Sequence, residues 1–238
     1  MKNILTIDVE ELFHAEYAGN LGKKSDVLRT PYNLPKILNL LDEHNTKATF
    51  FVVGEVAEKC PAIMEEVIAR GHEVAFHSYD HRPLWEKSPK LLETEIKRFN
   101  KLLTSIIGGK CIGFRAPSFS LNNKTVWALE VLESVGMLYD SSVFPAWTPL
   151  YGVSGALLRP YKPSRSDLTM EDVDCKLWEF PLAVYSLFGL RIPAAGGFYL
   201  RFIPSFVYLA IKKLNKLGSP AVIYIHNWEL DFDTPRLK

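Results

Sequence analysis

Short apolar runs alternate along this chain with longer segments in which apolar residues recur every three or four positions. The short runs, typical of buried strands, are residues 3–7, 48–53, 73–76, 111–114, 137–139, 176–181 and 221–225. The longer segments predict amphipathic helices over residues 34–44, 56–71, 91–107, 124–135 and 203–217. This alternation of strand and helix predicts an α/β fold built on a parallel sheet.

Three segments show neither pattern. Residues 17–29 predict a polar, glycine-containing loop, and residues 187–199 predict an apolar, glycine-rich loop. Residues 151–174 are rich in Pro, Gly and Ser, and predict a long excursion from the regular fold. No linker, internal repeat or low-complexity stretch divides the chain. With about seven strands, residues 1–238 are therefore expected to form a single domain, a distorted (β/α) barrel rather than an open sheet.

Composition limits the classes of partner. Apolar residues make up 47% of the 238 residues, which is enough for a sizeable core. The 28 basic and 27 acidic residues leave a net charge of +1, so no overall field attracts nucleic acid. Three widely spaced cysteines without a C-x-x-C pair indicate buried free thiols rather than a disulfide frame.

The N-terminal residues lead directly into a predicted strand, without the apolar core or cleavage site of a secretion signal. No stretch approaches the ~20 apolar residues of a membrane-spanning helix. These observations predict a cytoplasmic location without an integral membrane segment, and peripheral association with a membrane is compatible with them. The oligomeric state does not follow from the sequence.

Two histidines four residues apart, His77 and His81, follow a predicted strand. Imidazoles at this spacing can turn toward one point and bind a divalent metal if a third protein ligand, usually a carboxylate, lies close by. Alone, such a pair is more typical of two surface histidines in a loop. Asp8 and Glu10 strengthen the metal interpretation, although capping of a helix would also account for one of these acids.

Other polar residues also follow predicted strands, namely Arg115, Asp140 and His226. The carboxyl ends of parallel strands share one edge, so these side chains are expected to gather there. A metal site would leave one carboxylate to act as general base on water, with a guanidinium to keep it ionised. A separate histidine could protonate the leaving group. This set of side chains indicates metal-assisted hydrolysis of an amide or ester.

Four segments, residues 6–10, 77–81, 115–118 and 223–226, resemble in this order the motifs of the polysaccharide deacetylase family, the NodB-homology or carbohydrate esterase family 4 enzymes. The resemblance covers nearly the whole chain. It is closest to a subgroup associated with exopolysaccharide and capsule loci, through the stretches Arg-Ala-Pro-Ser-Phe-Ser, Tyr-Asp-Ser-Ser, Trp-Glu-Phe-Pro-Leu and His-x-Trp-Glu. Members of that subgroup often continue past the point at which this chain stops.

The resemblance implies a NodB-like barrel that removes acetyl groups from N-acetylated sugars with a divalent, zinc-like ion. The family's roles fall on the base Asp8, the metal ligands His77 and His81, the bracing Arg115, the acid His226 and the oxyanion-binding backbone N–H of Ser118. The substrate would be a glycan or a lipid- or nucleotide-linked sugar.

One departure from the family concerns the third metal ligand. Val9 stands where the commonest first motif has a second aspartate. Successive side chains of a strand alternate between its faces, so Asp8 and Glu10 are expected to point the same way, with Val9 in the core. Glu10 is therefore the expected third ligand. Glu11 is the alternative if the chain turns sharply after Val9.

The second departure concerns the acid histidine, because the aspartate that usually tunes it has no clear counterpart. Glu179 is a candidate substitute, although it could simply lie at a strand edge. Substrate contacts are expected from Asp140, Tyr199 and Trp228. Asp140 could equally cap a turn, and Tyr199 could belong to an apolar lid or core loop.

These residues favour hydrolytic N-deacetylation of a glycan or glycan precursor. One alternative keeps the site and changes the substrate to a small, cyclic amide. Another is a catalytically silent glycan-binding module, against which the intact Asp8, His77, His81 and His226 argue. An open groove with exposed Trp228 would favour a polymer over a small amide.

Overall fold

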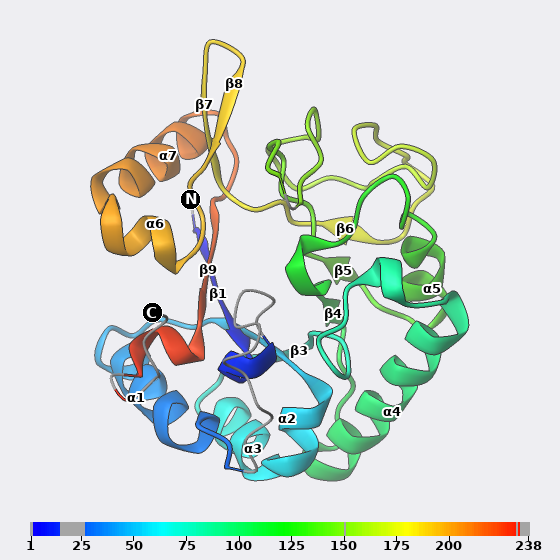
Figure 1. Cartoon of the computed structure of the whole chain (residues 1–238), viewed down its shortest axis with the longest axis vertical. Helices are drawn as coiled ribbons and strands as arrows, with labels where there is room; N and C mark the ends of the chain where they lie inside the picture. The colour runs from blue at the N-terminus through cyan, green and yellow to red at the C-terminus, as the bar shows by residue number, and fades with distance from the viewer. Residues whose placement is uncertain (1, 15–26, 150, 232, 234–238) are drawn as a thin grey trace.

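The computed structural model of the protein describes residues 2–14, 27–149, 151–231 and 233. At its centre lies a seven-stranded parallel sheet (Figure 1). Its strands, in spatial order, are β6 (Trp178–Glu179), β5 (Tyr139–Asp140), β4 (Gly113–Phe114), β3 (Glu73–Phe76), β2 (Thr49–Val52), β1 (Ile4–Val9) and β9 (Val222–His226). The segment after β6 reaches β9 through a hydrogen bond from the N–H of Ala183 to the carbonyl of Val222, at 3.0 Å. The seven-stranded, barrel-like α/β architecture expected from the sequence is confirmed.

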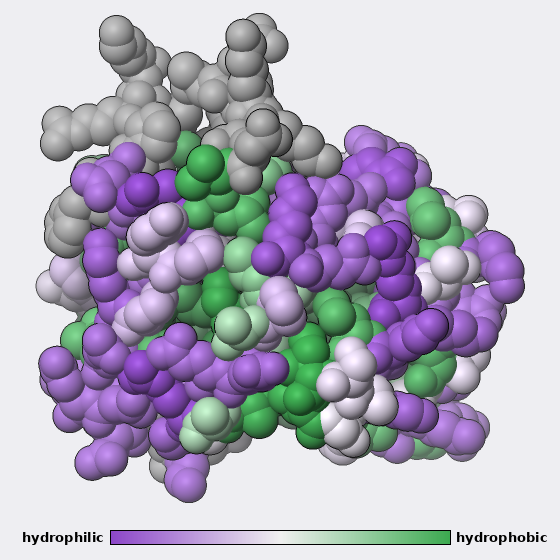
Figure 2. Space-filling view, turned by 90° about the horizontal axis from the view of Figure 1, so that it is seen from below, coloured by the Kyte–Doolittle hydropathy of each residue, from purple (hydrophilic) through white to green (hydrophobic). Residues whose placement is uncertain are grey.

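Helices cover the outside of this sheet (Figure 1). The α-helices are α1 (Thr30–Glu43), α2 (Gly54–Lys59), α3 (Pro61–Ala69), α4 (Pro89–Ile107), α5 (Ala128–Ser134), α6 (Gly197–Phe202) and α7 (Pro204–Lys216). Short 3-10 turns are η1 (Leu12–His14), η3 (Leu84–Glu86), η4 (Pro117–Phe119) and η5 (Asn227–Leu230). Figure 2 shows one face of the molecule as largely hydrophilic with smaller apolar areas, as expected where amphipathic helices turn their polar sides outward.

Strand register aligns the ends of the strands at one edge. Asp8 in β1 pairs with His226 in β9, although the two are at opposite ends of the chain. Phe76, the last residue of β3, pairs with Phe114, the last residue of β4. The residues that directly follow these strands therefore enter the same region of space, at the edge where parallel α/β folds carry their sites.

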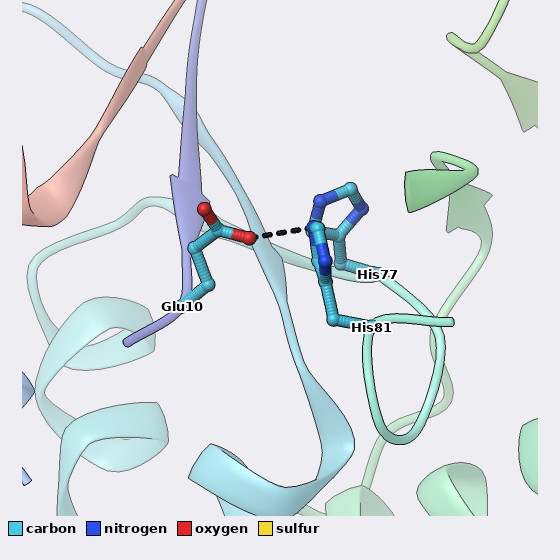
Figure 3. Close-up of side chains that lie close together, drawn as sticks. All are labelled: Glu10, His77 and His81. Atoms are coloured by element: carbon cyan, nitrogen blue, oxygen red, sulfur yellow. Dashed lines mark ion pairs between the residues drawn. The ribbon is translucent and has the colours of Figure 1, made fainter. Parts of the chain in front are cut away.

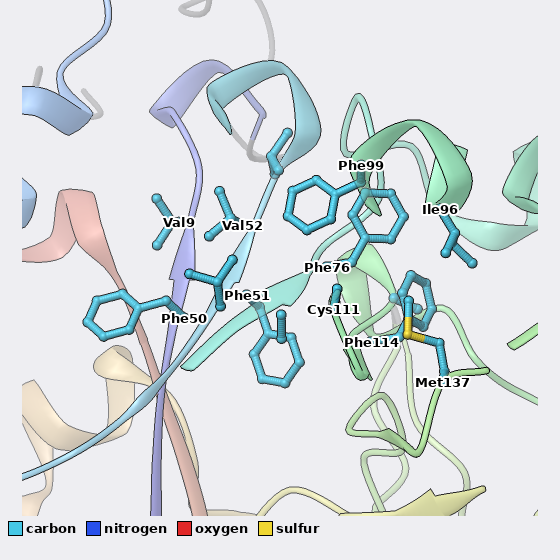
Figure 4. Close-up of a cluster of buried hydrophobic side chains, with 14 of the residues drawn as sticks. Val9, Phe50, Phe51, Val52, Phe76, Ile96, Phe99, Cys111, Phe114 and Met137 are labelled. Atoms are coloured by element: carbon cyan, nitrogen blue, oxygen red, sulfur yellow. The ribbon is translucent and has the colours of Figure 1, made fainter. Parts of the chain in front are cut away.

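The core lies between the sheet and its helices (Figure 4). Phe50, Phe51 and Phe76 of the central strands are buried there, together with Val9. A second apolar cluster joins β9 to α7 and to the chain after β6, so the C-terminal part packs on the same sheet. The three cysteines are free thiols, as predicted, and Cys111 and Cys175 are buried, whereas Cys60 is only partly buried.

Helix α4 illustrates how local signals set helix ends. The side chain of Ser88 accepts a hydrogen bond from the N–H of Leu91, and Pro89 occupies the first turn. Gly108 ends the helix with φ 71°, a left-handed conformation that glycine adopts at little cost. The predicted helix over residues 91–107 is confirmed, with one more half-turn at its start.

The prediction of a loop over residues 187–199 is wrong. This region forms the antiparallel hairpin of β7 (Val184–Leu187) and β8 (Leu190–Pro193), followed by α6. Val184 is the one residue of these two strands that is buried, so apolar periodicity, which reports burial, does not reveal them. The turn itself, Phe188-Gly189, has φ 48° and φ 82°, as two-residue hairpin turns require.

Several predicted boundaries also change. Pro61 divides the helical face over residues 56–71 into α2 and α3, because proline lacks the N–H that would continue the first helix. Strand β1 extends to Val9, and α1 begins at Thr30 rather than at residue 34. Most of the loop predicted over residues 17–29 lies outside the described residues. In the part of the chain that the structure describes, no helix is both long and apolar enough to cross a membrane.

Candidate active site and metal centre

The acidic side chains at the end of β1 point in different directions. Val9 is fully buried in the core, while Asp8 and Glu10 point to the opposite side, toward the site. Glu11 turns away. One of its carboxylate oxygens accepts hydrogen bonds from the N–H and hydroxyl of Thr30, at 2.9 and 2.6 Å, where it caps α1. Glu10 rather than Glu11 is thus available to a metal.

Glu10, His77 and His81 form a group of three potential metal ligands (Figure 3). Their ligand atoms all lie within 4.8 Å of one another. A carboxylate oxygen of Glu10 lies 2.6 Å from Nε2 of His81, with both side chains almost fully buried. Two imidazoles and one carboxylate are a typical ligand set for catalytic zinc, which keeps a further position open.

The surroundings of this group also fit a divalent ion. Nδ1 of His77 lies 2.8 Å from the carbonyl of Arg115, an acceptor, so it carries the proton and leaves Nε2 free to bind a metal. The indole N–H of Trp228 donates to Glu10 at 3.2 Å, and the backbone N–H of Glu10 donates to Asn227 at 2.9 Å. Supporting contacts of this kind orient metal ligands.

Charges within the group shift its protonation equilibria. Burial alone would raise the pKa of Glu10, but the charges of His81, His226 and His77 outweigh it and hold this pKa well below its usual range. Burial lowers the pKa of His77 to about 4, against the opposing charge of Asp8. Glu10 is therefore a carboxylate and His77 a neutral imidazole, the forms in which both bind metals.

Asp8 forms a buried ion pair with Arg115. Nη1 of Arg115 donates to Asp8 at 2.7 Å and to the hydroxyl of Thr6 at 2.8 Å. The guanidinium also donates to the carbonyl and hydroxyl of Ser141, and stacks on the ring of Phe51 at 4.1 Å. Arg115 is fully buried, so its orientation is fixed, and with it that of the Asp8 carboxylate.

His226 has a carboxylate partner that the sequence did not suggest. Its Nδ1 lies 2.6 Å from Glu229, three residues further along in η5. Its ring stacks on Trp228, with centroids 4.6 Å apart and an interplanar angle of 14°. Burial would lower the pKa of His226, but the hydrogen bond to Glu229 and the charge of Glu10 raise it to about 9. His226 is thus a protonated imidazolium at neutral pH.

Two loops at this edge contain residues in unusual backbone conformations. Ser78 and His81 have φ 64° and 58°, and Ser118 and Phe119 have φ 53° and 48°. These are four of the six described non-glycine residues with positive φ. Each such residue costs about 1–3 kcal/mol and persists only where surrounding structure enforces it, which is common at functional sites.

Other residues expected at the site are placed differently. Asp140 is fully buried and accepts a hydrogen bond from the Ser142 hydroxyl at 2.5 Å, so its carboxylate supports the local structure. Glu179 is also fully buried, as the register partner of Asp140, and is not the partner of His226. Tyr199 is half-buried in α6 against the second apolar cluster.

Two functional contacts were missed. Glu229 belongs to the His-x-Trp-Glu stretch, and its spacing of three residues from His226 was the available signal, provided that a helical turn follows β9. His14 lies behind the metal group, where its ring stacks on that of His81 with centroids 6.0 Å apart. Nothing in the sequence near His14 indicates this contact.

Fold and site together define the class: an α/β barrel with a Glu-His-His group, a buried Asp–Arg pair and a His–Glu pair at the carboxyl ends of its strands. The chain belongs to the polysaccharide deacetylase family. The family model "Polysaccharide deacetylase" matches residues 20–139, and a model described as "Domain of unknown function (DUF3473)" matches residues 141–238. Both regions contribute strands to the one sheet.

Related proteins carry names that agree with this family. The chain is 36% identical over 97 residues to the peptidoglycan-N-acetylglucosamine deacetylase of Bacillus cereus, covering 40% of this chain and 35% of the relative. It is 34% identical over 106 residues to the chitooligosaccharide deacetylase of Rhizobium leguminosarum bv. phaseoli, covering 44% of each. The aligned part thus spans less than half of either relative.

Solved structures share the fold at lower identity. A Mycobacterium smegmatis protein assigned to the polysaccharide deacetylases superposes with a TM-score of 0.60 at 23% identity, over 95% of this chain and 78% of that one. A family 4 carbohydrate esterase from Streptomyces lividans gives 0.51 at 17%, over 95% and 79%. A family 4 pseudoenzyme from Bacillus anthracis gives 0.51 at 16%, over 94% and 54%.

Proposed function

We propose that this protein is a divalent-metal-dependent deacetylase that hydrolyses the acetamido group of an N-acetylated sugar in a glycan or glycan precursor. The observation that carries the proposal is the gathering of three different functional groups at one sheet edge. The Glu10, His77 and His81 group would hold the ion, which we take to be zinc or a similar metal. Asp8 and His226, each fixed by a charged partner, would move the protons.

The roles of the protein's own residues follow from their contacts. When bound, a divalent ion would polarise the acetyl carbonyl and make a nearby water more acidic. Asp8, oriented by its ion pair with Arg115, would accept a proton from the attacking water. His226 would donate its proton to the sugar nitrogen as the C–N bond breaks, which releases acetate and the free amino sugar. The backbone N–H of Ser118 would stabilise the oxyanion.

A groove near this site favours a saccharide chain over a small amide. It encloses about 460 Å³, and its lining includes Asn122, Trp147, Thr148 and Tyr151. Trp147 is 74% exposed, which suits stacking against a sugar ring. Uncharged amide and hydroxyl groups beside it can exchange hydrogen bonds with sugar hydroxyls.

Aromatic contacts connect this groove to the catalytic groups. The ring of Tyr151 lies 5.4 Å from that of Phe119, which lies 4.9 Å from Tyr224. Tyr224 in turn contacts His226, with ring centroids 5.5 Å apart. Because the rings of Phe119 and Tyr224 are buried, the groove lies three ring contacts away from His226, and only a substrate longer than a single sugar would reach both. Trp228, by contrast, is half-buried and committed to Glu10, so it does not provide an exposed platform.

The test combines metal analysis of the purified protein with acetate release from a panel of N-acetylated oligosaccharides, monosaccharides and small cyclic amides. We expect bound divalent metal and activity on oligosaccharides, both lost on chelation and restored by zinc or cobalt. Asp8→Asn should keep the metal and lose about 100-fold or more of the rate. Full activity in metal-free protein would refute the mechanism. Bound metal without acetate release from any sugar would favour a silent glycan-binding module.

A further inference from the structure

The C-terminal third of the chain has an unusual distribution of charge. Residues 180–228 contain no Asp or Glu, although the whole chain contains 27. The same segment carries the cations Arg191, Arg201, Lys212, Lys213 and Lys216. It forms the hairpin β7–β8, helices α6 and α7, and β9. This segment therefore carries a net charge of +5, in a protein whose overall net charge is +1.

These cations have no carboxylate partner among the described residues. Arg191 donates to the backbone carbonyls of Pro145 and Ala156, at 3.0 and 2.6 Å. Arg201 donates to a backbone carbonyl at 2.8 Å, and Lys213 donates to another. Carbonyl groups satisfy the donors without neutralising the charge, so this part of the surface keeps a positive field.

The hairpin tip exposes large apolar side chains. Phe188 is fully exposed, Leu190 is 64% exposed and Leu187 is 42% exposed. Phe188 also has a positive φ of 48°, which is rare for a bulky residue and costs free energy. The hairpin turn accounts for the backbone conformation, but packing among the described residues does not cover these apolar side chains. Figure 1 shows the hairpin projecting away from the rest of the chain.

The base of the hairpin is held firmly. The ring of Tyr185 in β7 packs against Phe206 of α7, with centroids 5.2 Å apart, and Lys213 lies over the same tyrosine at 4.9 Å. The N–H of Ala194 donates to the carbonyl of Ala183 at 3.0 Å. The tip is therefore presented on a fixed support.

Helices α6 and α7, next to the hairpin, continue this apolar and basic character. Phe198 and Phe202 of α6 are each 66% exposed, and Leu209 of α7 is 52% exposed. Lys212, one turn after Tyr208, is exposed on the same helix and lies over that ring at 5.4 Å. Exposed apolar residues among unpaired cations are typical of surfaces that bind membranes.

We propose that the hairpin tip, Leu187, Phe188 and Leu190, together with the exposed sides of α6 and α7, docks this protein onto the surface of an anionic lipid bilayer. The apolar tip would enter the boundary between headgroups and acyl chains, and the lysines would contact lipid phosphates. A soluble polyanion would leave the apolar tip exposed to water, so the tip favours a lipid surface. A second copy of the same basic surface would be repelled by its like charge.

Helix α6 of this surface reaches the catalytic edge, whereas the hairpin tip projects from the opposite end of β1 and β9 (Figure 1). Arg201 of α6 binds the backbone carbonyl of Glu229, and Gly197 at the start of α6 lies against the Glu229 side chain. The docking surface thus adjoins the partner of His226. On the proposed function, the substrate class that suits this arrangement is a lipid-carried glycan long enough to extend from the bilayer to the catalytic edge.

The experiment is co-sedimentation of the full chain with vesicles of phosphatidylcholine alone or mixed with phosphatidylglycerol. We expect binding to the mixed vesicles that weakens at high salt, and little binding to phosphatidylcholine alone. Phe188→Ser combined with Leu190→Ser should lower binding at least about tenfold, and so should Lys212→Ser combined with Lys216→Ser. The matched control, Val173→Ser, changes an apolar residue that is 83% exposed elsewhere, and should bind normally.

Circular dichroism of each variant establishes that it is folded. Absence of binding to mixed vesicles, or full binding by the Phe188 and Leu190 variant, would overturn the proposal. A dimer in sedimentation velocity that only the tip variant loses, without vesicle binding, would assign the surface to a second copy. Acetate release is measured on the same preparations. Vesicle binding by the unmodified chain without acetate release from any sugar would refute the proposed function and leave the docking surface standing, and Asp8→Asn, whose loss of activity is expected, should bind vesicles normally.

Discussion

His226 and Glu229 form a pair within one turn of η5, with Nδ1 of the imidazole 2.6 Å from the glutamate oxygen. The pair sets which nitrogen faces the site. Since Nδ1 is directed at the carboxylate, Nε2 is the atom turned toward Glu10, 3.8 Å away. Glu229 is therefore a positioning residue. It takes the role of the aspartate that usually tunes the acid histidine, for which the sequence has no clear counterpart.

Replacing Glu229 with Gln should lower kcat about 10- to 100-fold, because an amide does not stabilise the protonated imidazole. Glu229 contributes to the pKa of about 9 at His226, so its removal lowers this pKa. The alkaline limb of the pH–rate profile should then move to lower pH. Metal content should stay unchanged. A uniform loss of rate without a shift of that limb would mean that Glu229 is merely structural.

Gly197 offers an independent route to the same pair. A methyl group at this position would occupy the place of the Glu229 carboxylate. Gly197→Ala should therefore displace Glu229 and lower kcat, with little loss of stability because the backbone does not require glycine. Gly109→Ala is the matched control, because its nearest neighbour, a side-chain carbon of Ile107, would lie at an ordinary 3.5 Å. Equal activity of the two variants would contradict the role assigned to Glu229.

Metal content distinguishes Glu10 from Glu11. Glu10→Ala should lower metal affinity by well over the 10- to 100-fold that loss of a supporting contact costs. Glu11→Ala should keep the metal, but lower the free energy of unfolding by about 1–2 kcal/mol because α1 loses its cap. Metal analysis and thermal unfolding measure the two effects. Loss of metal in the Glu11 variant alone would reverse the assignment.

The sequence predicted those parts of the site that depend on regular strands. Alternation of side chains in an extended segment placed Asp8 and Glu10 together, and Val9 in the core. The pairing of Glu229 with His226 depends on a short 3-10 turn, which apolar periodicity does not signal. The hairpin escaped prediction because its tip residues, such as Phe188, are apolar yet exposed. Apolar periodicity predicts which side chains are buried, so it cannot identify an apolar side chain that is exposed for contact with another surface.

Trp147 should contribute to binding of longer substrates only. Loss of its exposed ring by Trp147→Ala removes a stacking contact worth about 1 kcal/mol, so KM for an oligosaccharide should rise about fivefold. The KM for a single N-acetylated sugar should stay the same, and so should kcat. Steady-state kinetics on both substrates test this. An equal change of KM for both substrates would mean that Trp147 does not bind the substrate in the groove.

Asp140 and Glu179 are register partners at the ends of β5 and β6, and both are fully buried. Burial raises the pKa of Glu179 well above its usual value, and the nearby charge of Asp140 raises it further. Glu179 is therefore protonated in the folded protein at pH values where the unfolded chain has lost this proton. Such a group stabilises the fold fully below its unfolded pKa, and this contribution is lost as pH rises toward the folded pKa.

Glu179→Gln should remove this dependence, because the amide imitates the protonated acid and still accepts the hydrogen bond from the N–H of Val143. Relative to the original protein, the variant should gain stability on the order of 1 kcal/mol between about pH 5 and about pH 8. Chemical denaturation across this range measures the difference. Glu130→Gln, at an exposed position on α5, is the control and should show no such trend. An unchanged pH dependence in the Glu179 variant would mean that the buried pair is held by Arg115 as two carboxylates.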